Sequence, residues 1–467
     1  INAALNTKDE NDSPEEHFTD TIKAACGLAD PNAVWGMTQA APELVHWLLK
    51  LGVKFNMSGY DDVDLRNFGG QKKKRTAFAQ SDTGKQIMTA MIDAVRRKEA
   101  SGMVERFSHH SFLTLRLCGN ICCGCVIRDE YSQETVELPG DAVIVATGGM
   151  HGLFGNTTGS LSNTGEVTAE LFRLGVPLAN GEMIQYHPTT VKCGGKRMLI
   201  SEAARGEGGR LFAMKDGKQW YFMEEKYPEL GNLMPRDITA REIWKVSHES
   251  EVFLDMTEIS EEIISNKLSG LADDCMTYLH KDIRKEPVSV LPGIHYFMGG
   301  ILVDEQHRTP IQNLCAAGEC CAQYHGANRL GGNSLLGALY GGRVTAKSAC
   351  EQADVVDLSC ATQIDFPPAS QISEIKQLNK VMQETMGVVR NENTLLNGIQ
   401  TVQALTGNLP LLGMAVLKSA LARKESRGAH WREDYPKSND DDYLKTTVAR
   451  FDGKQIQISF VPVPERR

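Results

Sequence analysis

The sequence predicts an α/β fold divided into two or three domains, with a helical region near the C-terminus. Three observations support this prediction. The chain has 467 residues, which is more than one compact core usually holds. Residues 311–319 are typical of a short buried strand ending in a tight turn, and helical spacing of apolar residues begins at Asn333. Helical spacing returns between residues 370 and 424 after a polar linker at 353–372, which indicates a bundle of three helices.

The composition excludes several functional classes. Charged residues make up 23% and apolar residues 41% of the chain, as in ordinary globular proteins. The net charge of -9 argues against nucleic acid as a partner. No apolar run reaches the roughly 20 residues that a membrane-spanning helix needs, and no signal-peptide pattern opens the sequence. We therefore expect any membrane attachment to come from other subunits.

The cysteines indicate a reducing compartment. Twelve are present, and the adjacent pairs at 122–123 and 320–321 are rare in disulfide frameworks. One segment holds a cluster of four, Cys118, Cys122, Cys123 and Cys125. Their spacing matches no common iron–sulfur or zinc pattern, and the segment alternates like a β-hairpin. We therefore interpret the four as small buried thiols and predict no metal site.

The first 150 residues predict helices followed by a β-meander. The helices are expected at Pro14 to Cys26 and Asn32 to Leu51, the second ending at Gly52 as a left-handed cap, and a third begins at Asp82. The meander covers residues 103–147 and ends in the buried strand DAVIVATGG.

Residues 291–342 combine the features expected of a ligand site. His295 precedes a strand that ends on Glu319, Arg329 lies beside a glycine pair, and a helix begins at Asn333 and Ser334. The N-terminus of a helix favours anionic groups, and a carboxylate at a strand tip accepts hydrogen bonds from sugar-like hydroxyls. The segment therefore predicts a cofactor-binding floor with cationic substrate-binding groups at its rim.

The motifs HYFMGG, AAGE and HGANRLGGNSLL in this segment resemble the flavoprotein subunits of succinate dehydrogenase and fumarate reductase, with L-aspartate oxidase as a near relative. The resemblance extends from residue 1 to about residue 460. It implies a Rossmann-like FAD-binding domain with an inserted α+β capping domain and a C-terminal three-helix bundle. The domain ranges implied are 1–180 and 291–352 for the FAD-binding domain, 181–290 for the capping domain and 370–467 for the helical domain. The first βαβ unit of the family, with its glycine-rich FAD turn, is not found in the 467 residues.

The resemblance also implies how FAD is held. The residues implied are Ala146, Thr147, Gly148, Glu319, Asn333, Ser334 and Leu335. For the substrate, succinate or fumarate, the implied binding residues are His187, Thr189, Ser201, His295 and Arg329. A dicarboxylate has two anionic ends, so cationic or hydrogen-bonding groups are needed at both, and an arginine can clamp a carboxylate through two parallel bonds.

For catalysis the resemblance implies that Arg236 transfers the proton and that Glu202 and Arg205 form its relay. A guanidinium stays protonated in water, so it needs such a relay to exchange a proton. His295 is the alternative general base, on the expectation that its pKa lies near the ordinary value for histidine.

The resemblance implies a catalytic subunit that interconverts succinate and fumarate by hydride transfer with FAD and passes electrons to an iron–sulfur subunit. Membrane-anchor subunits are further candidate partners, which would place a cytoplasmic protein on the inner face of the membrane. The segment RKESRGAHWREDYP at 423–436 favours this activity over L-aspartate oxidase. L-aspartate oxidase and a truncated paralogue without FAD are the alternatives.

Overall fold

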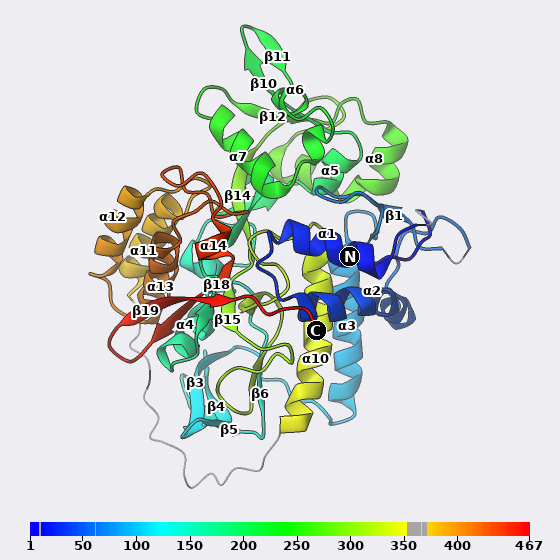
Figure 1. Ribbon diagram of the computed structural model, residues 1–467. Coiled ribbons are helices and arrows are strands. Elements are labelled where there is room, and N and C mark those ends of the chain that lie inside the picture. Colours follow the sequence, from blue (N-terminus) through cyan, green and yellow to red (C-terminus); the bar gives the residue numbers. More distant parts are fainter. Residues whose placement is uncertain (9–10, 61, 353–365, 367–370) are drawn as a thin grey trace.

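A computed structural model of the protein describes residues 1–8, 11–60, 62–352, 366 and 371–467 (Figure 1). It consists of a lower body, a lobe above it and a group of helices at one side of the body (Figure 1). Nearly all of the predicted linker at 353–372 lies outside the described residues.

The helices predicted near the N-terminus are present, and their bounds lie within two residues of the prediction. They are α1 (Pro14–Ala24), α2 (Pro31–Leu51) and α3 (Thr83–Ala100). Asp30 caps α2 by accepting hydrogen bonds from the backbone N–H groups of Asn32 and Ala33, and Gly52 ends it at φ 100° as predicted. These helices share an apolar core with the first half of α10 (Asn333–Gln352), the helix predicted to begin at Asn333. A short hairpin of β1 (Leu65–Arg66) and β2 (Thr76–Ala77) lies beside them.

The body holds a parallel pair of short strands, β6 (Val143–Val145) and β16 (Leu314–Ala316). The strand predicted at 311–319 is shorter than expected because Asn313 has a left-handed backbone, at φ 61°, directly before it. The predicted meander is confirmed as β3 (His110–Cys118), β4 (Ile121–Asp129) and β5 (Thr135–Pro139). A five-stranded sheet has the order β17 (Cys321–Ala322), β15 (Gly300–Leu302), β7 (Leu178–Ala179), β18 (Lys445–Phe451) and β19 (Ile456–Pro462).

The cysteines of the meander differ from the prediction at one position. Cys122 and Cys123 on β4 are buried free thiols, and Cys125 is a partly buried free thiol. Cys118 is disulfide-bonded, so the interpretation of all four residues as free thiols is wrong for this one. It is only half-buried and ends β3 beside the turn at Gly119.

We call residues 200–290 the cap lobe, because their buried apolar side chains form a core of their own (Figure 1, top). Its helices are α5 (Glu202–Gly206), α6 (Phe222–Lys226), α7 (Arg236–Val246), α8 (Glu261–Lys267) and α9 (Ser269–Asp274). Its sheet has the order β11 (Lys218–Trp220), β10 (Arg210–Lys215), β12 (Val252–Asp255) and β13 (Val288–Ser289). A three-stranded sheet joins the lobe to the body, in the order β14 (Leu291–Phe297), β8 (Ile184–Cys193) and β9 (Lys196–Leu199).

The predicted three-helix bundle is present at the side of the body. It consists of α11 (Ile372–Thr385), α12 (Glu392–Val402) and α13 (Asn408–Ala422), and it packs against α4 (Glu166–Arg173). The chain then passes through the short α14 (Asp440–Tyr443) into the hairpin of β18 and β19. This hairpin is part of the body, because β18 pairs with β7 through Val448 and Ala179.

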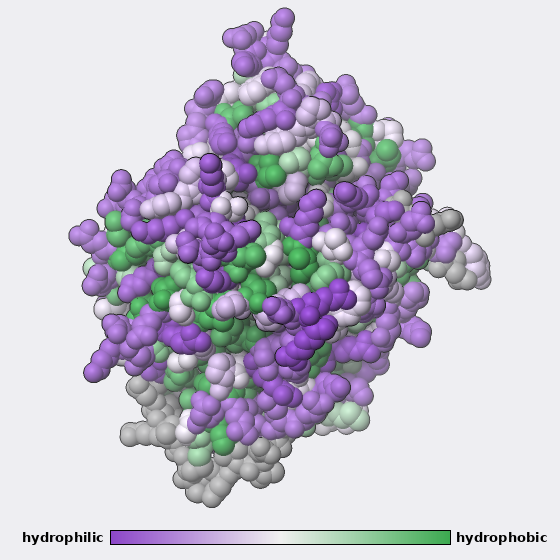
Figure 2. Space-filling view, viewed as in Figure 1, coloured by the Kyte–Doolittle hydropathy of each residue, from purple (hydrophilic) through white to green (hydrophobic). Residues whose placement is uncertain are grey.

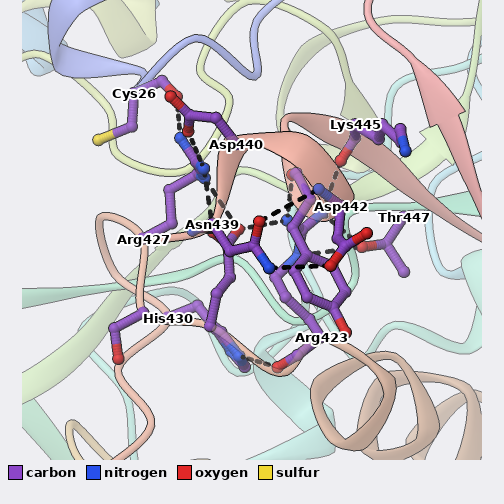
Figure 3. A network of polar contacts seen from close by, with 12 residues as sticks. Cys26, Arg423, Arg427, His430, Asn439, Asp440, Asp442, Lys445 and Thr447 are labelled. Atoms are coloured by element: carbon purple, nitrogen blue, oxygen red, sulfur yellow. Dashed lines mark hydrogen bonds and ion pairs between the residues drawn. The ribbon is translucent and has the colours of Figure 1, made fainter. Parts of the chain in front are cut away.

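A buried polar network fastens the C-terminal segment to the rest of the molecule (Figure 3). Arg423, whose side chain is 0% exposed, donates hydrogen bonds to Glu182 and Glu425, both at 2.7 Å. Arg427 pairs with Glu425 and Asp440 and donates to the carbonyl oxygen of Cys26, just after α1, at 3.2 Å. The network therefore joins the end of the bundle to the start of β8 and to the N-terminal helices.

The visible face of the cap lobe is mostly hydrophilic, and apolar residues gather in the middle of the body below it (Figure 2). Among the residues that the structure describes, no helix combines the length and the apolar character needed to cross a membrane.

We expect Arg423→Met to destabilise the protein strongly. The substitution leaves the carboxylates of Glu182 and Glu425 buried without their common cation, which typically lowers the free energy of unfolding by about 3–5 kcal/mol. Urea unfolding followed by circular dichroism measures the change. Arg284→Met is the matched control, because Arg284 pairs with Asp282 on the surface and should not shift the midpoint measurably. An unfolding midpoint for Arg423→Met equal to that of the control would contradict the assignment.

Candidate active site

Strand β8 carries one wall of the site. Alternate residues of a strand point to the same face, and Gln185, His187 and Thr189 are all buried. The neighbouring strand β14 brings His295 beside them, with the imidazole rings of His187 and His295 5.2 Å apart in an edge-to-face arrangement.

The cap lobe contributes a buried ion-pair group. Arg236 begins α7, and its Nη2 and Nε donate to Oε2 of Glu202 at 2.5 and 2.9 Å. Arg205 lies on the other side of this carboxylate, with its Nη2 3.6 Å from Oε1. Oε1 also accepts a hydrogen bond from the backbone N–H of Gly69 at 2.8 Å. A Cβ atom at position 69 would lie 2.5 Å from Oε1, so only glycine permits this close approach.

Glu202 is ionised in this environment. Burial alone would raise the pKa of its carboxyl, but the charges of Arg236 and Arg205 outweigh burial and hold the pKa below its ordinary value. Burial lowers the pKa of Arg205. The three residues predicted to form a proton relay thus lie together, with Glu202 hydrogen-bonded to Arg236 and 3.6 Å from Arg205.

Arg329 is a buried cation from the body of the molecule. Its guanidinium carbon lies 4.3 Å from the centre of the Tyr296 ring, and its Nε has no hydrogen-bond partner among the described residues. Burial first, and then the charge of Arg236, lower the pKa of Arg329 to about 9, so it is charged at neutral pH. Arg329 and Arg236 line one pocket of about 480 Å³, together with Gly69 and Gly70. A pocket between the cap lobe and the body therefore has a guanidinium from each.

The two histidines are neutral. Burial lowers the pKa of His187 and His295 well below the ordinary value, and the charges of Arg236 and Arg329 act in the same direction. The expectation of an ordinary pKa for His295 is therefore wrong. Its Nδ1 is 2.8 Å from the hydroxyl of Thr158, which leaves Nε2 as the ring atom that can meet a ligand. A neutral imidazole with a low pKa is a weak general base.

The two predicted hydroxyl ligands are placed differently from each other. Thr189 is fully buried and donates its hydroxyl proton to the carbonyl oxygen of Ile200 at 2.9 Å, so that proton is already committed. Ser201 is only partly buried and caps α5 by accepting from the N–H of Ala203, which leaves its own proton available. Ser201 lines a second pocket of about 630 Å³, together with Thr158.

The residues predicted to hold FAD lie where the parallel strands β6 and β16 end. The N–H of Ala317 donates to the carbonyl oxygen of Val145 at 2.9 Å, which brings the two strand ends together. Ala146 and Thr147 are exposed there, and Gly148 is partly exposed. Glu319 follows β16 in a single 3-10 turn, and its Oε1 accepts from the N–H of Phe297 at 3.0 Å. The carboxylate is 20% exposed, so it can also accept a hydrogen bond from a ligand.

The start of α10 has a structural role as well. Asn333 is fully buried, and its amide group is bonded to Asn2, His17 and Thr21 at 2.8–3.0 Å. Its side chain is therefore committed to holding the N-terminal segment. The adjacent Ser334 and Leu335 are partly exposed in the first turn of the helix, where backbone N–H groups favour an anionic group.

These features fit FAD. An exposed carboxylate at a strand end suits the hydroxyls of a ribityl or ribose chain, and the exposed turn at 146–148 allows close approach of backbone to a cofactor. Glu319, the turn at 146–148 and the first amides of α10 would hold it.

Comparison with known proteins shows the family of the chain. A family model described as FAD binding domain matches residues 1–335, and one described as fumarate reductase flavoprotein C-term matches residues 405–466. The succinate dehydrogenase flavoprotein subunit of Bacillus subtilis is 36% identical over 531 aligned positions, which cover 100% of this chain and 90% of that protein. The chain belongs to the succinate dehydrogenase and fumarate reductase flavoprotein family. It is therefore an FAD-dependent oxidoreductase of this family.

Solved structures support the same fold. A quinol fumarate reductase chain from E. coli superimposes with a TM-score of 0.89 at 26% identity, covering 99% of this chain and 88% of that one. The α/β fold class with a C-terminal helical bundle is confirmed. L-aspartate oxidase from Nostoc is a further relative, 31% identical over 94% of this chain and 86% of its own length.

Two buried amides in the site, Gln185 and Asn328, are absent from the set that the motifs predict. Gln185 accepts a hydrogen bond from Arg236 Nη1 at 3.1 Å and donates to Asn328 Oδ1 at 3.0 Å. A signal was available for Gln185, because it precedes His187 by two residues on a strand and so shares its face. Asn328 is visible only from the three-dimensional contacts.

We expect His17 to make the protein less stable in mild acid. Burial lowers the pKa of His17 from 6.5 to about 3, so below pH 6.5 the unfolded chain binds a proton that the folded protein does not. Between pH 7 and pH 5 this difference reduces the free energy of unfolding by about 2 kcal/mol. His17→Gln can still donate to Asn333 and should lose less stability over this range. Urea unfolding at several pH values measures the slope of the free energy of unfolding against pH.

The exposed His46 is the matched control, and His46→Gln should leave the slope unchanged. Equal slopes for the unmodified protein and His17→Gln would show that His17 is not the group responsible.

Proposed function

We propose that the protein interconverts succinate and fumarate, with Arg236 and Arg329 binding the two carboxylates of the substrate. The observation that carries the proposal is the charge of the site. Arg205 and Arg236 flank the buried carboxylate of Glu202, Arg329 is buried nearby without an ion-pair partner among the described residues, and both nearby histidines are neutral. Positive charge therefore exceeds negative charge among these four side chains, which favours the binding of a dianion. A four-carbon dicarboxylate is such a dianion.

Different residues bind the two ends of the substrate in this proposal. The Nε of Arg329 has no hydrogen-bond partner among the described residues, and its guanidinium lies over the ring of Tyr296, which fixes its orientation. The guanidinium can therefore bind one carboxylate through two parallel hydrogen bonds. His295 supports the same end through Nε2, and Ser201 donates its hydroxyl proton at the other end. Thr189 acts by holding Ile200, the residue before Ser201, in place.

Arg236 exchanges the substrate proton. In the direction of succinate oxidation, one carbon loses a hydride and its neighbour loses a proton. FAD, when bound, supplies the hydride acceptor. Arg236 receives the proton, since Glu202, bonded at 2.5 Å, can take a proton from its guanidinium and Arg205 continues the path. The same positive charges stabilise the negative charge that develops beside the carboxylate of the substrate.

Electrons leave the flavoprotein through an iron–sulfur partner in this proposal, and membrane-anchor subunits would hold the assembly at the inner face of the membrane. The support is that the relatives are named as subunits, among them the flavoprotein subunit of an 8-methylmenaquinol:fumarate reductase from Wolinella succinogenes. A direct test is copurification of the tagged chain with an iron–sulfur protein from its native host.

An assay separates this function from L-aspartate oxidation. The FAD-loaded protein should reduce an artificial dye when given succinate, and it should form no hydrogen peroxide with L-aspartate. Peroxide formation from L-aspartate without succinate-linked dye reduction would replace the proposal with the oxidase. A protein purified without flavin absorbance, and unable to take up FAD, would indicate the FAD-free alternative.

We expect Arg236→Ala to reduce kcat for succinate by about 10²–10⁴-fold, the usual contribution of a positioned proton-transfer group. Succinate binding should persist, although weakened, because Arg329 remains. Dye-linked steady-state kinetics give kcat, and titration calorimetry gives the dissociation constant. Lys245→Ala on the exposed side of the same helix is the control and should leave kcat unchanged. If Arg236→Ala retains the kcat of the control, Arg236 does not transfer the proton.

A further inference from the structure

Two buried amide side chains connect the arginines of the site. Gln185 Oε1 accepts from Arg236 Nη1 at 3.1 Å, and Gln185 Nε2 donates to the carbonyl oxygen of Arg329 at 2.8 Å. The same Nε2 donates to Asn328 Oδ1 at 3.0 Å, and Asn328 Nδ2 donates to Asp237 Oδ1 at 3.2 Å. Arg236 and Asp237 begin α7 in the cap lobe, whereas Asn328 and Arg329 belong to the body, so the amide pair crosses between them.

Both ends of this connection are fixed. Gln185 is 0% exposed and lies on β8, where it pairs with Tyr296 of β14. Asn328 is preceded by Ala327, whose N–H donates to the carbonyl oxygen of Ala25 at 3.0 Å and whose carbonyl oxygen accepts from Ala429 at 2.9 Å. The amide pair therefore links two supported segments and is not itself a flexible contact.

The connection is needed because the two arginines repel each other. Each is nearly buried, and the charge of Arg236 lowers the pKa of Arg329 in addition to the effect of burial. A carboxylate in the place of Gln185 would neutralise part of the charge on which a dianion depends. A neutral amide holds both residues, one through its guanidinium and one through its backbone, without adding a negative charge to the site.

We propose that Gln185 and Asn328 are positioning residues that set the spacing between Arg236 and Arg329 and thereby select dicarboxylates by chain length. This inference rests on the proposed function, because it takes the two arginines to bind opposite ends of one dianion. A fixed spacing favours the four-carbon succinate over the five-carbon glutarate, since the longer dianion cannot meet both guanidinium groups in good geometry. When the connection is removed, repulsion lets the arginines separate and the preference disappears.

The test compares the FAD-loaded protein with Gln185→Leu, Asn328→Leu and the double variant. Titration calorimetry gives the dissociation constants of succinate and glutarate without turnover, and dye-linked kinetics give kcat and KM. We expect each single variant to lower the preference for succinate over glutarate about tenfold and to lower kcat/KM for succinate about 10²-fold. The double variant should be no worse than the more severe single one, because the two amides act as a unit.

Gln323→Leu is the matched control. Gln323 is a buried glutamine that donates to the carbonyl oxygen of Asp304 and is not bonded to either arginine in the described structure. It should leave the preference unchanged. Gln185→Met and Asn328→Ala, which remove the hydrogen bonds without adding charge, replace the leucine variants if those do not fold, with the same expected loss of preference.

Several outcomes would overturn the inference. One is an unchanged ratio of glutarate to succinate affinity in variants that bind both ligands more weakly, which would indicate a merely structural role. Another is additive losses in the double variant. If the unmodified FAD-loaded protein binds succinate but the variants keep its chain-length preference, only this inference fails. If the unmodified protein binds neither dicarboxylate, the proposed function itself fails.

Discussion

The site depends on the burial of like charges around one carboxylate. Glu202 accepts hydrogen bonds from Arg236 and from the backbone of Gly69, and Arg205 lies on its other side, with the carboxylate 1% exposed. Removing this carboxylate would leave two guanidinium groups buried side by side, which the fold could not support without water or a ligand. Because Glu202 and both partners belong to the cap lobe while Gly69 belongs to the body, the same interaction also fixes how the lobe meets the body. The chemistry of the site and the packing of the two parts thus share one contact.

In the proposed function, the surplus positive charge left by this arrangement favours a dianionic substrate. Arg329 is buried without a carboxylate partner among the residues described, and the cation–π contact with Tyr296 compensates only part of its lost hydration. A structure that keeps such a cation dry is less stable than one that pairs it internally. An anionic ligand that pairs with Arg329 recovers this lost stability when it binds. A carboxylate partner within the protein would therefore stabilise the empty protein but weaken the binding of such a ligand.

Much of the fold could be predicted from the sequence because its elements carry local signals. The caps of α2, the helical spacing after residue 370 and the strand before Thr147 are set by neighbouring residues, and each of these elements is present. Features set by distant residues were less visible. The pairing of β18 with β7 and the disulfide of Cys118 depend on contacts that no local pattern encodes.

In the site, too, local motifs identify some features, and others depend on contacts between distant residues. Motifs single out Arg236, Glu202, Arg205 and Arg329, which the structure brings to one place, yet they carry no information on which hydrogen-bond donors are already used. Only the contacts reveal that the hydroxyl of Thr189 and the amide of Asn333 are committed within the protein. For the same reason the depressed pKa of His295 could not be predicted, since it follows from burial beside other positive groups.

The placement of β18 between β7 and β19 has a consequence for biosynthesis. β7 is made early and pairs with a strand that lies more than half the chain length further on, at Val448. The sheet of the body is therefore incomplete until β18 has been synthesised, and the edge of β7 that β18 covers stays open until then. A premature stop before residue 445 would leave β7 paired with β15 alone.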